Sequence, residues 1–448
     1  MDKSVISRAA VASEGRFAPG HLGELTQQVP FEMVDAVLED TCRLQRRVRD
    51  LPSRVVVYLL LAGCLFAELG YPQVWRRLSA GLGGAPAAAP TASAMTQARR
   101  RLGAGPLREL FFLLRGPSPH AARWKGLLVC AVDGTILTVA DSPANLTAYS
   151  KQRGGPCGGG SYPTLRLLAL VACGTRTVID AVFRPVSDGE TTCAPLLLPS
   201  LRAGMVLLAD RNFGAGFLAA QIAATRADFL IRVRTGRGAP ALPVLRRLPD
   251  GSWLSRFGGV PVRVIDAEIA LVTSAGRTAG RYRLVTTLAD PARYPAREAV
   301  LLYRERWEIE TCYLELKSTI LGGRVLRART PGGIEQEIYA LLVTYQALRT
   351  AIADAAGTVP GTDPDRASFT IALSTARDQV ILAAGIAPGP ADLAGAIGRA
   401  VLSSLMPARR LRTGPRAVKR AISKYNARGK VDRTTRKATI DIALLAPP

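Results

Sequence analysis

Apolar residues recur at helical spacing in the first part of the chain and in continuous runs further on. One face of a helix is apolar over residues 31–49, at Phe31, Val34, Val37 and Leu38. Proline and glycine residues separate this helix from further short ones that continue to residue 120. The first thirty residues show no such period. The pattern predicts a flexible N-terminus over residues 1–30 and a helical domain over residues 31–120.

Continuous apolar runs after residue 121 predict a β-sheet. They occupy residues 127–132, 165–171, 178–183, 205–209 and 229–233. Strands as uniformly apolar as these are buried on both faces, which is typical of a mixed α/β sheet flanked by helices. Asp133 and Asp210 each follow directly after a run, and open α/β sheets usually place their sites at strand ends. We therefore expect the first part of a catalytic domain over residues 121–235.

The last third of the chain changes pattern twice. Residues 236–290 contain short β-type segments between glycine turns. Residues 296–320 contain neither proline nor glycine and are rich in Glu, Arg, Leu and Ala, which predicts one long helix. We expect a β-rich insertion over residues 236–290, the second part of the catalytic domain over 291–350, and C-terminal helices with a basic tail over 351–448.

The helix expected over residues 296–320 places one acid at the edge of its buried face. At about 100° per residue, four side chains share an arc of roughly 60°. These four are Tyr303, Arg306, Glu310 and Lys317. The buried stripe beside them consists of Leu302, Ile309, Leu316 and Ile320, while Glu305, Glu308 and Glu315 are expected to be solvated. Ion pairs along an amphipathic helix would explain the same pattern without any function.

The charge of the chain narrows the class of partner. With 59 Lys and Arg against 35 Asp and Glu, the formal net charge is +24 and the isoelectric point is about 10.5. Such an excess predicts a polyanionic partner, nucleic acid first and an anionic membrane second. The alternative is a generally basic protein with no such partner.

The cysteine pattern argues against a zinc site, and the hydropathy pattern argues against a membrane-spanning protein. The seven cysteines form no C-x2-C pair and the chain has two histidines, so reduced, buried thiols are expected instead of a zinc site. No signal peptide opens the sequence. The longest apolar run, residues 55–66, is too short to span a bilayer. We expect a cytoplasmic protein with no membrane partner.

The spacing Y-x2-R-x3-E-x6-K, formed by Tyr303, Arg306, Glu310 and Lys317, resembles the signature of a subgroup of the DDE transposases of bacterial insertion sequences. The segments AVDGT around Asp133 and LLADRNF around Asp210 are similar to that subgroup's first two catalytic segments. The resemblance covers roughly residues 30 to 350 and is specific at the three acidic segments. It implies a ribonuclease-H-like mixed sheet, interrupted by the β-rich insertion, with an N-terminal helical domain and a C-terminal helical region.

The resemblance also implies an activity and its residues. The protein would bind the inverted-repeat ends of an insertion sequence, cleave DNA with metal-activated water and join the 3′-OH ends to target DNA by cut-and-paste transposition. Asp133, Asp210 and Glu310 would be catalytic and would hold two Mg²⁺ or Mn²⁺ ions, because hard oxygen ligands suit these ions and three carboxylates alone would repel one another. Asp133 would bridge the ions, and Asp210 and Glu310 would each hold one.

Contacts with double-stranded DNA are expected from two parts of the chain. Tyr303, Arg306 and Lys317 would bind phosphates near the cleaved end. Arg99, Arg100 and Arg101 lie on a helix of the N-terminal domain, and short helices with an arginine-rich member are compatible with a helix-turn-helix-like reader of the element ends. Any small helical bundle has a similar layout. Cutting paired ends implies a homodimer in the DNA complex.

Other interpretations remain open in the sequence alone. The protein could be a non-catalytic DNA-binding protein, such as a repressor or decayed transposase, or a metal-dependent nuclease of the same fold that does not join DNA. Glu190 opens a helix-like segment and is the best substitute for one of the three acids, with N-terminal capping as its structural alternative. Trp253 could hold a flipped base, although a core position is the simpler expectation. Residues 153–161 are glycine-rich but lack the ending of a phosphate-binding loop.

Overall fold

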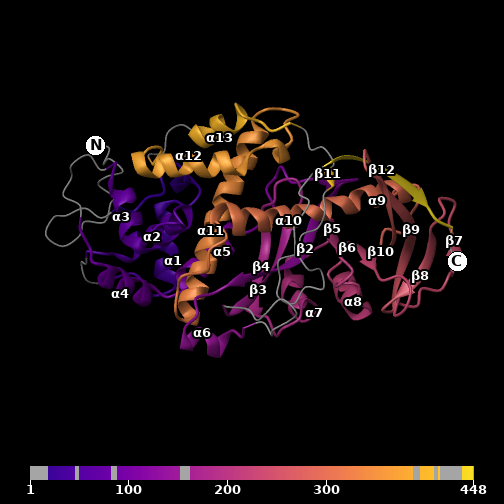
Figure 1. Ribbon diagram of the computed structural model, residues 1–448, viewed down its shortest axis with the longest axis horizontal. Helices are drawn as coiled ribbons and strands as arrows, with labels where there is room; N and C mark the ends of the chain where they lie inside the picture. The colour runs from indigo at the N-terminus through magenta and orange to yellow at the C-terminus, as the bar shows by residue number, and fades with distance from the viewer. Residues whose placement is uncertain are drawn as a thin grey trace. The chain divides into compact units, whose positions relative to one another are not determined.

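A computed structural model describes most of the chain, in two compact units (Figure 1). It describes residues 19–45, 50–81, 88–151, 162–386, 394–407, 412–413 and 436–446. The glycine-rich segment 153–161 and most of the basic tail therefore lie outside the described residues, as do residues 1–18. The first unit comprises residues 1–120, 138–145 and 312–407, and the second comprises residues 121–137, 146–311 and 408–448.

The first unit is helical. Its N-terminal helices are α1 (Phe31–Asp40), α2 (Ser53–Leu65), α3 (Tyr71–Ser79), α4 (Ala92–Leu102) and α5 (Gly105–Leu114). Its C-terminal helices are α11 (Pro331–Gly357), α12 (Phe369–Leu382) and α13 (Gly395–Leu402). The 3₁₀ turn η3 (Leu25–Gln27) precedes α1, and the 3₁₀ turn η7 (Pro364–Arg366) precedes α12. The long helix α11 contacts α2, α5, α12 and α13, so helices from before and after the sheet in the sequence share one core (Figure 1).

Helix boundaries in this unit follow the expected signals with two differences. The first helix ends at Asp40 and not near residue 49, because Cys42 takes a left-handed conformation (φ 54°) that cannot continue a helix. Leu22, Leu25 and Val29 are buried, so the flexibility expected of the N-terminus does not extend to residues 19–30. Within the described parts of the chain, no helix has the length and apolar character needed to cross a membrane.

The second unit is built on a mixed sheet whose described strands run in the order β11-β12-β9-β10-β6-β5-β2-β3-β4. The central strands are β2 (Leu127–Thr138), β3 (Thr164–Ala172), β4 (Val178–Pro185), β5 (Met205–Ala209) and β6 (Asp228–Val233). β2 and β5 are parallel, β5 and β6 are parallel, and β3 and β4 are antiparallel. This order and these directions confirm the expected ribonuclease-H-like α/β sheet.

Both faces of the central strands are buried, as their uniform apolar sequences predict. Alternate residues of β2 and β5 pack with the helical segments α8 (Gly216–Ala224) and η4 (Ala194–Ser200) in one hydrophobic cluster. The intervening residues, such as Ala131 and Leu208, are also fully buried. The short segments β1 (Arg123–Trp124) and α7 (Glu190–Cys193) flank these strands in the sequence, and α6 (Pro143–Ala148) follows β2.

The β-rich insertion extends the sheet instead of standing apart from it. Its strands are β7 (Arg246–Arg247), β8 (Trp253–Phe257), β9 (Val260–Thr273) and β10 (Gly276–Thr286), and β10 pairs with β6. Trp253 is fully buried, which supports the core alternative for this side chain. The chain then returns to β9 near its end, because β12 (Arg436–Leu444) pairs with it and β11 (Arg412–Thr413) pairs with β12. This C-terminal strand was not expected from the sequence.

The environment of His21 indicates that the stability of the first unit falls at acidic pH. It is buried, its Nε2 donates to the carbonyl of Leu78 at 3.0 Å, and its Nδ1 accepts from the N–H of Gly23 at 3.2 Å. Burial lowers the pKa of His21 below 6.5, because the charged ring is less stable away from water, and the hydrogen bond to Leu78 only partly opposes this shift. Below about pH 6.5 the unfolded chain gains a proton that the folded chain resists, so the free energy of unfolding falls with decreasing pH. Urea unfolding at pH 7.5 and 5.5 measures this, and His21→Gln should reduce the difference.

Candidate active site

Asp133 and Asp210 stand side by side on neighbouring parallel strands. Val132 of β2 is paired with Ala209 of β5, so the residue that follows each is an aspartate at the same level of the sheet. The N–H of Gly134 donates to Asp133 Oδ1 and the N–H of Asn212 donates to Asp210 Oδ1, each at 2.8 Å. The strand β2 continues to Thr138, so Asp133 lies within the strand and not at its end.

Arg306 lies between Glu310 and Asp133 and contacts both carboxylates. The Nη2 of Arg306 is 3.0 Å from Glu310 Oε1, and its Nη1 is 3.6 Å from Asp133 Oδ2. The exposed fraction of the side chain is 14% for Arg306, 19% for Asp133 and 33% for Glu310, so all three side chains are partly shielded from water. Arg306 therefore joins two of the three acids that the sequence selected, and the third, Asp210, lies beside Asp133 on the neighbouring strand.

The environment of Asp133 favours its neutral form. Burial raises the pKa of Asp133 to about 7, and the nearby charges of Asp210 and Glu190 add to this increase. The Gly134 hydrogen bond and the Arg306 guanidinium act in the opposite direction. Burial and the neighbouring acids thus destabilise the ionised form of Asp133, and a cation bound beside this carboxyl group would stabilise that form.

The carboxylates fit divalent ions by chemistry but do not form a closed cage. Within the residues that the structure describes, no group of three or more His, Cys, Asp and Glu side chains lies close enough together to hold a metal ion. The Arg306 guanidinium provides the positive charge between Asp133 and Glu310 instead. All-oxygen donor sets such as this one suit Mg²⁺ or Mn²⁺.

Two family matches now identify the class of protein. Residues 19–112 match the family described as "Insertion element 4 transposase N-terminal", and residues 124–346 match "Transposase DDE domain". The chain belongs to the DDE transposases of the IS4 family. The family expected from the Tyr303–Arg306–Glu310–Lys317 spacing is thereby confirmed, and so is an enzyme that acts in DNA transposition.

Individual relatives cover much of this transposase. It is 28% identical over 418 residues to the transposase InsG for insertion sequence element IS4 of Escherichia coli (strain K12), covering 88% of this chain and 91% of that protein. It is 28% identical over 192 residues to the putative transposase InsZ of the same strain, covering 42% and 62%. A cryo-EM structure of the piggyBac transposase synaptic complex with hairpin DNA aligns over 86% of this chain and 84% of that one, with a TM-score of 0.44 and 11% identity.

The helix of the transposase that carries Glu310 is not one regular α-helix, which corrects the expectation for residues 296–320. It comprises α9 (Ala296–Leu302), the 3₁₀ turn η5 (Tyr303–Arg306), α10 (Trp307–Leu314) and the π-helical turn η6 (Glu315–Ile320). Arg306 and Glu310 still share a face, because they are one α-helical turn apart and form an ion pair.

Two glutamates expected in solvent are buried, which is a second correction. Glu308 is 1% exposed and pairs with Arg176, whose Nε is 2.7 Å from Glu308 Oε2. Glu315 is also buried, and it pairs with Arg349 and accepts from the Tyr345 hydroxyl. Both arginines lie outside the helix sequence, so helical spacing alone gave no sign of them. Glu305 is exposed, as expected.

Tyr303 belongs to the same site, whereas Lys317 belongs to the other unit. Tyr303 is 7% exposed, and burial raises its pKa above the ordinary tyrosine value, with Arg306, Arg232 and Asp210 among the charges that act on it. Arg232 also stacks on Tyr282, with its guanidinium 3.9 Å from the ring centre. Lys317 is in η6 of the first unit, and its contact with DNA stays a prediction.

Arg99, Arg100 and Arg101 form the last turn of α4 in the first unit. Arg100 and Arg101 are exposed. Arg99 is half-buried, and its guanidinium lies 4.1 Å from the centre of the Tyr71 ring, so part of its binding capacity is used within the protein. Their role in reading element ends stays a prediction, for which Arg100 and Arg101 are the better placed.

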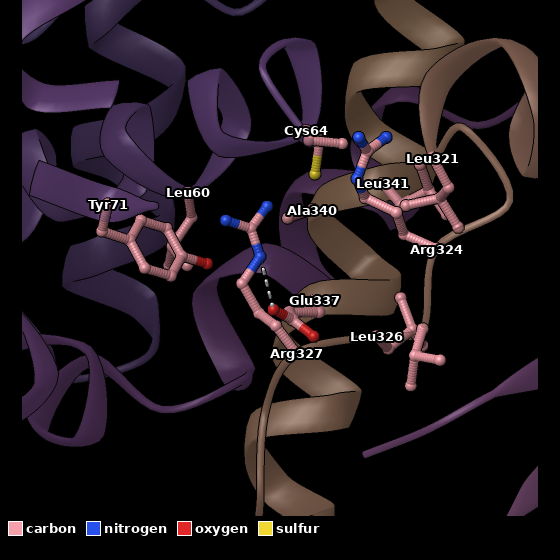
Figure 2. A pocket seen from close by; sticks show the side chains of 12 residues that line it. Leu60, Cys64, Tyr71, Leu321, Arg324, Leu326, Arg327, Glu337, Ala340 and Leu341 are labelled. Atoms are coloured by element: carbon pink, nitrogen blue, oxygen red, sulfur yellow. Dashed lines mark ion pairs between the residues drawn. The ribbon is translucent and has the colours of Figure 1, made fainter. Parts of the chain in front are cut away.

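A small cavity of the first unit, lined in part by Tyr71, Arg327 and Glu337, does not form a substrate site (Figure 2). Its volume of about 30 Å³ is that of roughly one water molecule, too small for a nucleotide. In it, Arg327 Nε lies 3.3 Å from Glu337 Oε1, and the other nitrogens of Arg327 donate to the carbonyls of Gly63 and Leu69. These contacts join the segment before α11 to the end of α2, which indicates a structural role.

Proposed function

We propose that this transposase binds the inverted-repeat ends of its insertion sequence, cleaves DNA with metal-activated water, and joins the freed 3′-OH ends to target DNA by a cut-and-paste route. The observation that carries this proposal is that Asp210 lies beside Asp133 on neighbouring strands while Arg306 joins Asp133 to Glu310. The reaction takes place on DNA in the bacterial cytosol, and the +24 formal charge suits such a polyanion.

The three acids would together bind two Mg²⁺ or Mn²⁺ ions. Asp133 would hold both ions, with Asp210 and Glu310 holding one each. When bound, such ions supply an activated water and stabilise the leaving oxygen of the phosphodiester. Asp133 must be deprotonated to bind them, and the Gly134 N–H and Arg306 favour that form.

Arg306 links the acids to the DNA in this proposal. A guanidinium binds phosphate as readily as carboxylate, and in both cases through paired hydrogen bonds. Arg306, which contacts Asp133 and Glu310 in the free protein, would bind a phosphate near the cleaved end in the DNA complex. Tyr303 and Lys317 complete the phosphate contacts, and Arg99, Arg100 and Arg101 contribute to end recognition.

The working complex contains at least two copies of the chain in this proposal. An insertion sequence has two ends, and each end needs one set of Asp133, Asp210 and Glu310. We therefore propose a homodimer that holds both ends of double-stranded DNA together before target DNA is bound.

DNA cleavage and joining assays test this function. With Mg²⁺, the protein should nick a duplex that ends in the element's inverted repeats and then form joined products with a short target duplication. EDTA should abolish cleavage but leave end binding, because the ions serve the chemistry and the basic side chains serve the binding. Scrambled ends of the same length are the control. Cleavage without joining would indicate a nuclease of the same fold, and binding without cleavage a non-catalytic DNA-binding protein.

A further inference from the structure

The carboxylate of Glu190 touches both segments that carry the paired aspartates. Its Oε2 accepts from the side-chain amide of Asn212 at 3.4 Å, and the backbone N–H of Asn212 holds Asp210. On its other side Glu190 lies against Gly134, whose backbone N–H holds Asp133. Each neighbour of Glu190 is therefore itself bonded to one aspartate.

Gly134 leaves no room for any side chain beside Glu190. A Cβ atom at this position would lie 2.6 Å from Glu190 Oε1 and 3.0 Å from its Cγ and Cδ. These distances are shorter than van der Waals contact, so a side chain here would push the carboxylate away. The Glu190 side chain therefore packs directly against the backbone of the strand that carries Asp133.

Arg166 of β3 fixes Glu190 in this place. Arg166 Nη1 lies 2.6 Å from Glu190 Oε1, and Arg166 Nε donates to the carbonyl of Asp188 at 3.0 Å. The two side chains are only 16% and 17% exposed, so their attraction is less screened than that of a surface pair. Because Arg166 and Asn212 hold the two oxygens of Glu190, this carboxylate is suited to orient the segments beside it.

We infer that Glu190, held by Arg166, is a positioning residue that sets the relative placement of Asp133 and Asp210 for metal binding. This inference rests on the proposed function, in which these aspartates hold the ions. It also replaces the helix-capping alternative that the sequence leaves open for Glu190, since its carboxylate pairs with Arg166 and Asn212.

Mn²⁺ affinity of the full-length protein, measured by titration calorimetry or by the free-ion EPR signal, tests this role without DNA cleavage. Glu190→Ala should weaken Mn²⁺ binding about tenfold, the usual loss when a partner of a metal ligand is removed. Glu190→Gln keeps an oxygen and similar length, so it should recover most of the affinity, which a direct ligand would not. Asp188→Asn removes a charge from the same segment without these contacts and should bind Mn²⁺ normally.

Gly134→Ala provides an independent test through the close contact. Alone it should weaken Mn²⁺ binding, because the new methyl group displaces Glu190. In combination with Glu190→Ala it should cause no further loss of Mn²⁺ affinity, because the side chain that the methyl group displaces is then absent. Additive losses would overturn the inference.

A reference variant separates this inference from the function on which it rests. Asp133→Ala should lose Mn²⁺ binding, and if it does not, the metal assignment of the proposed function is wrong. If Asp133→Ala loses binding while Glu190→Ala does not, only the positioning role is overturned. Thermal unfolding of each variant confirms that the comparison is made between folded proteins.

Discussion

Asp133→Ala, Asp210→Ala and Glu310→Gln should each reduce DNA cleavage by roughly a thousandfold or more, since each removes a charge that holds the catalytic ions. Glutamine at position 310 keeps an oxygen that can accept from Arg306, so its effect reports the lost charge and not a lost hydrogen bond. Single-turnover cleavage of a labelled element end measures the loss.

End binding separates a chemical defect from a folding defect in these variants. Gel-shift affinity for the element end should stay within a few-fold of the unmodified protein, because basic side chains supply most of that binding. Glu305→Gln, on the exposed face of the same helix, is the matched control and should cleave normally. Unimpaired cleavage by any one of the three variants would remove that residue from the catalytic assignment.

Arg176→Met should destabilise the second unit by about 3–5 kcal/mol, the usual cost of leaving one member of a buried ion pair alone. Arg176 and Glu308 are 2% and 1% exposed, so the remaining carboxylate would have no access to water. Combining it with Glu308→Leu should recover much of the loss, because both charges are then absent. Chemical denaturation of the two variants and the unmodified protein measures these changes.

An exposed pair in the same unit is the control for this prediction. Arg277 and Glu268 lie 2.7 Å apart with 51% and 39% of their side chains exposed. Arg277→Met should cost less than about 1 kcal/mol, because water stabilises the remaining charge. A double variant as unstable as Arg176→Met would show that the loss arises from packing around Arg176 and not from an unpaired charge.

The sequence predicted the two aspartates because strand burial leaves a strong local signal. The runs before Asp133 and Asp210 are apolar at every position, and neighbouring buried strands in an α/β sheet place equivalent ends together. Arg306 and Glu310 were placed on one face by helical spacing alone. The approach of Arg306 to Asp133, which joins Glu310 to that aspartate, depends on tertiary packing that spacing does not encode.

What the sequence missed depends on contacts between distant residues. Glu308 is buried because Arg176, 132 residues earlier, is buried with it, and a pattern that treats charges as solvated has no means of finding such a pair. The strand β12 was missed for the opposite reason, since Ile442 is its one buried residue among those described and the preceding positions alternate only between half-buried and exposed. Glu190 was noticed but not placed, because its neighbours Gly134 and Asn212 lie on other segments.

The pairing of Val132 with Ala209 determines which changes in chain length the active site can tolerate. Insertions or deletions in the connections between β2 and β5 leave the ladder of these strands intact, and both aspartates remain in place. One residue gained or lost within either strand would instead turn its aspartate toward the opposite face of the sheet. Copies of the element can therefore diverge in the lengths of these loops and remain active, whereas a single codon gained within β2 or β5 inactivates them.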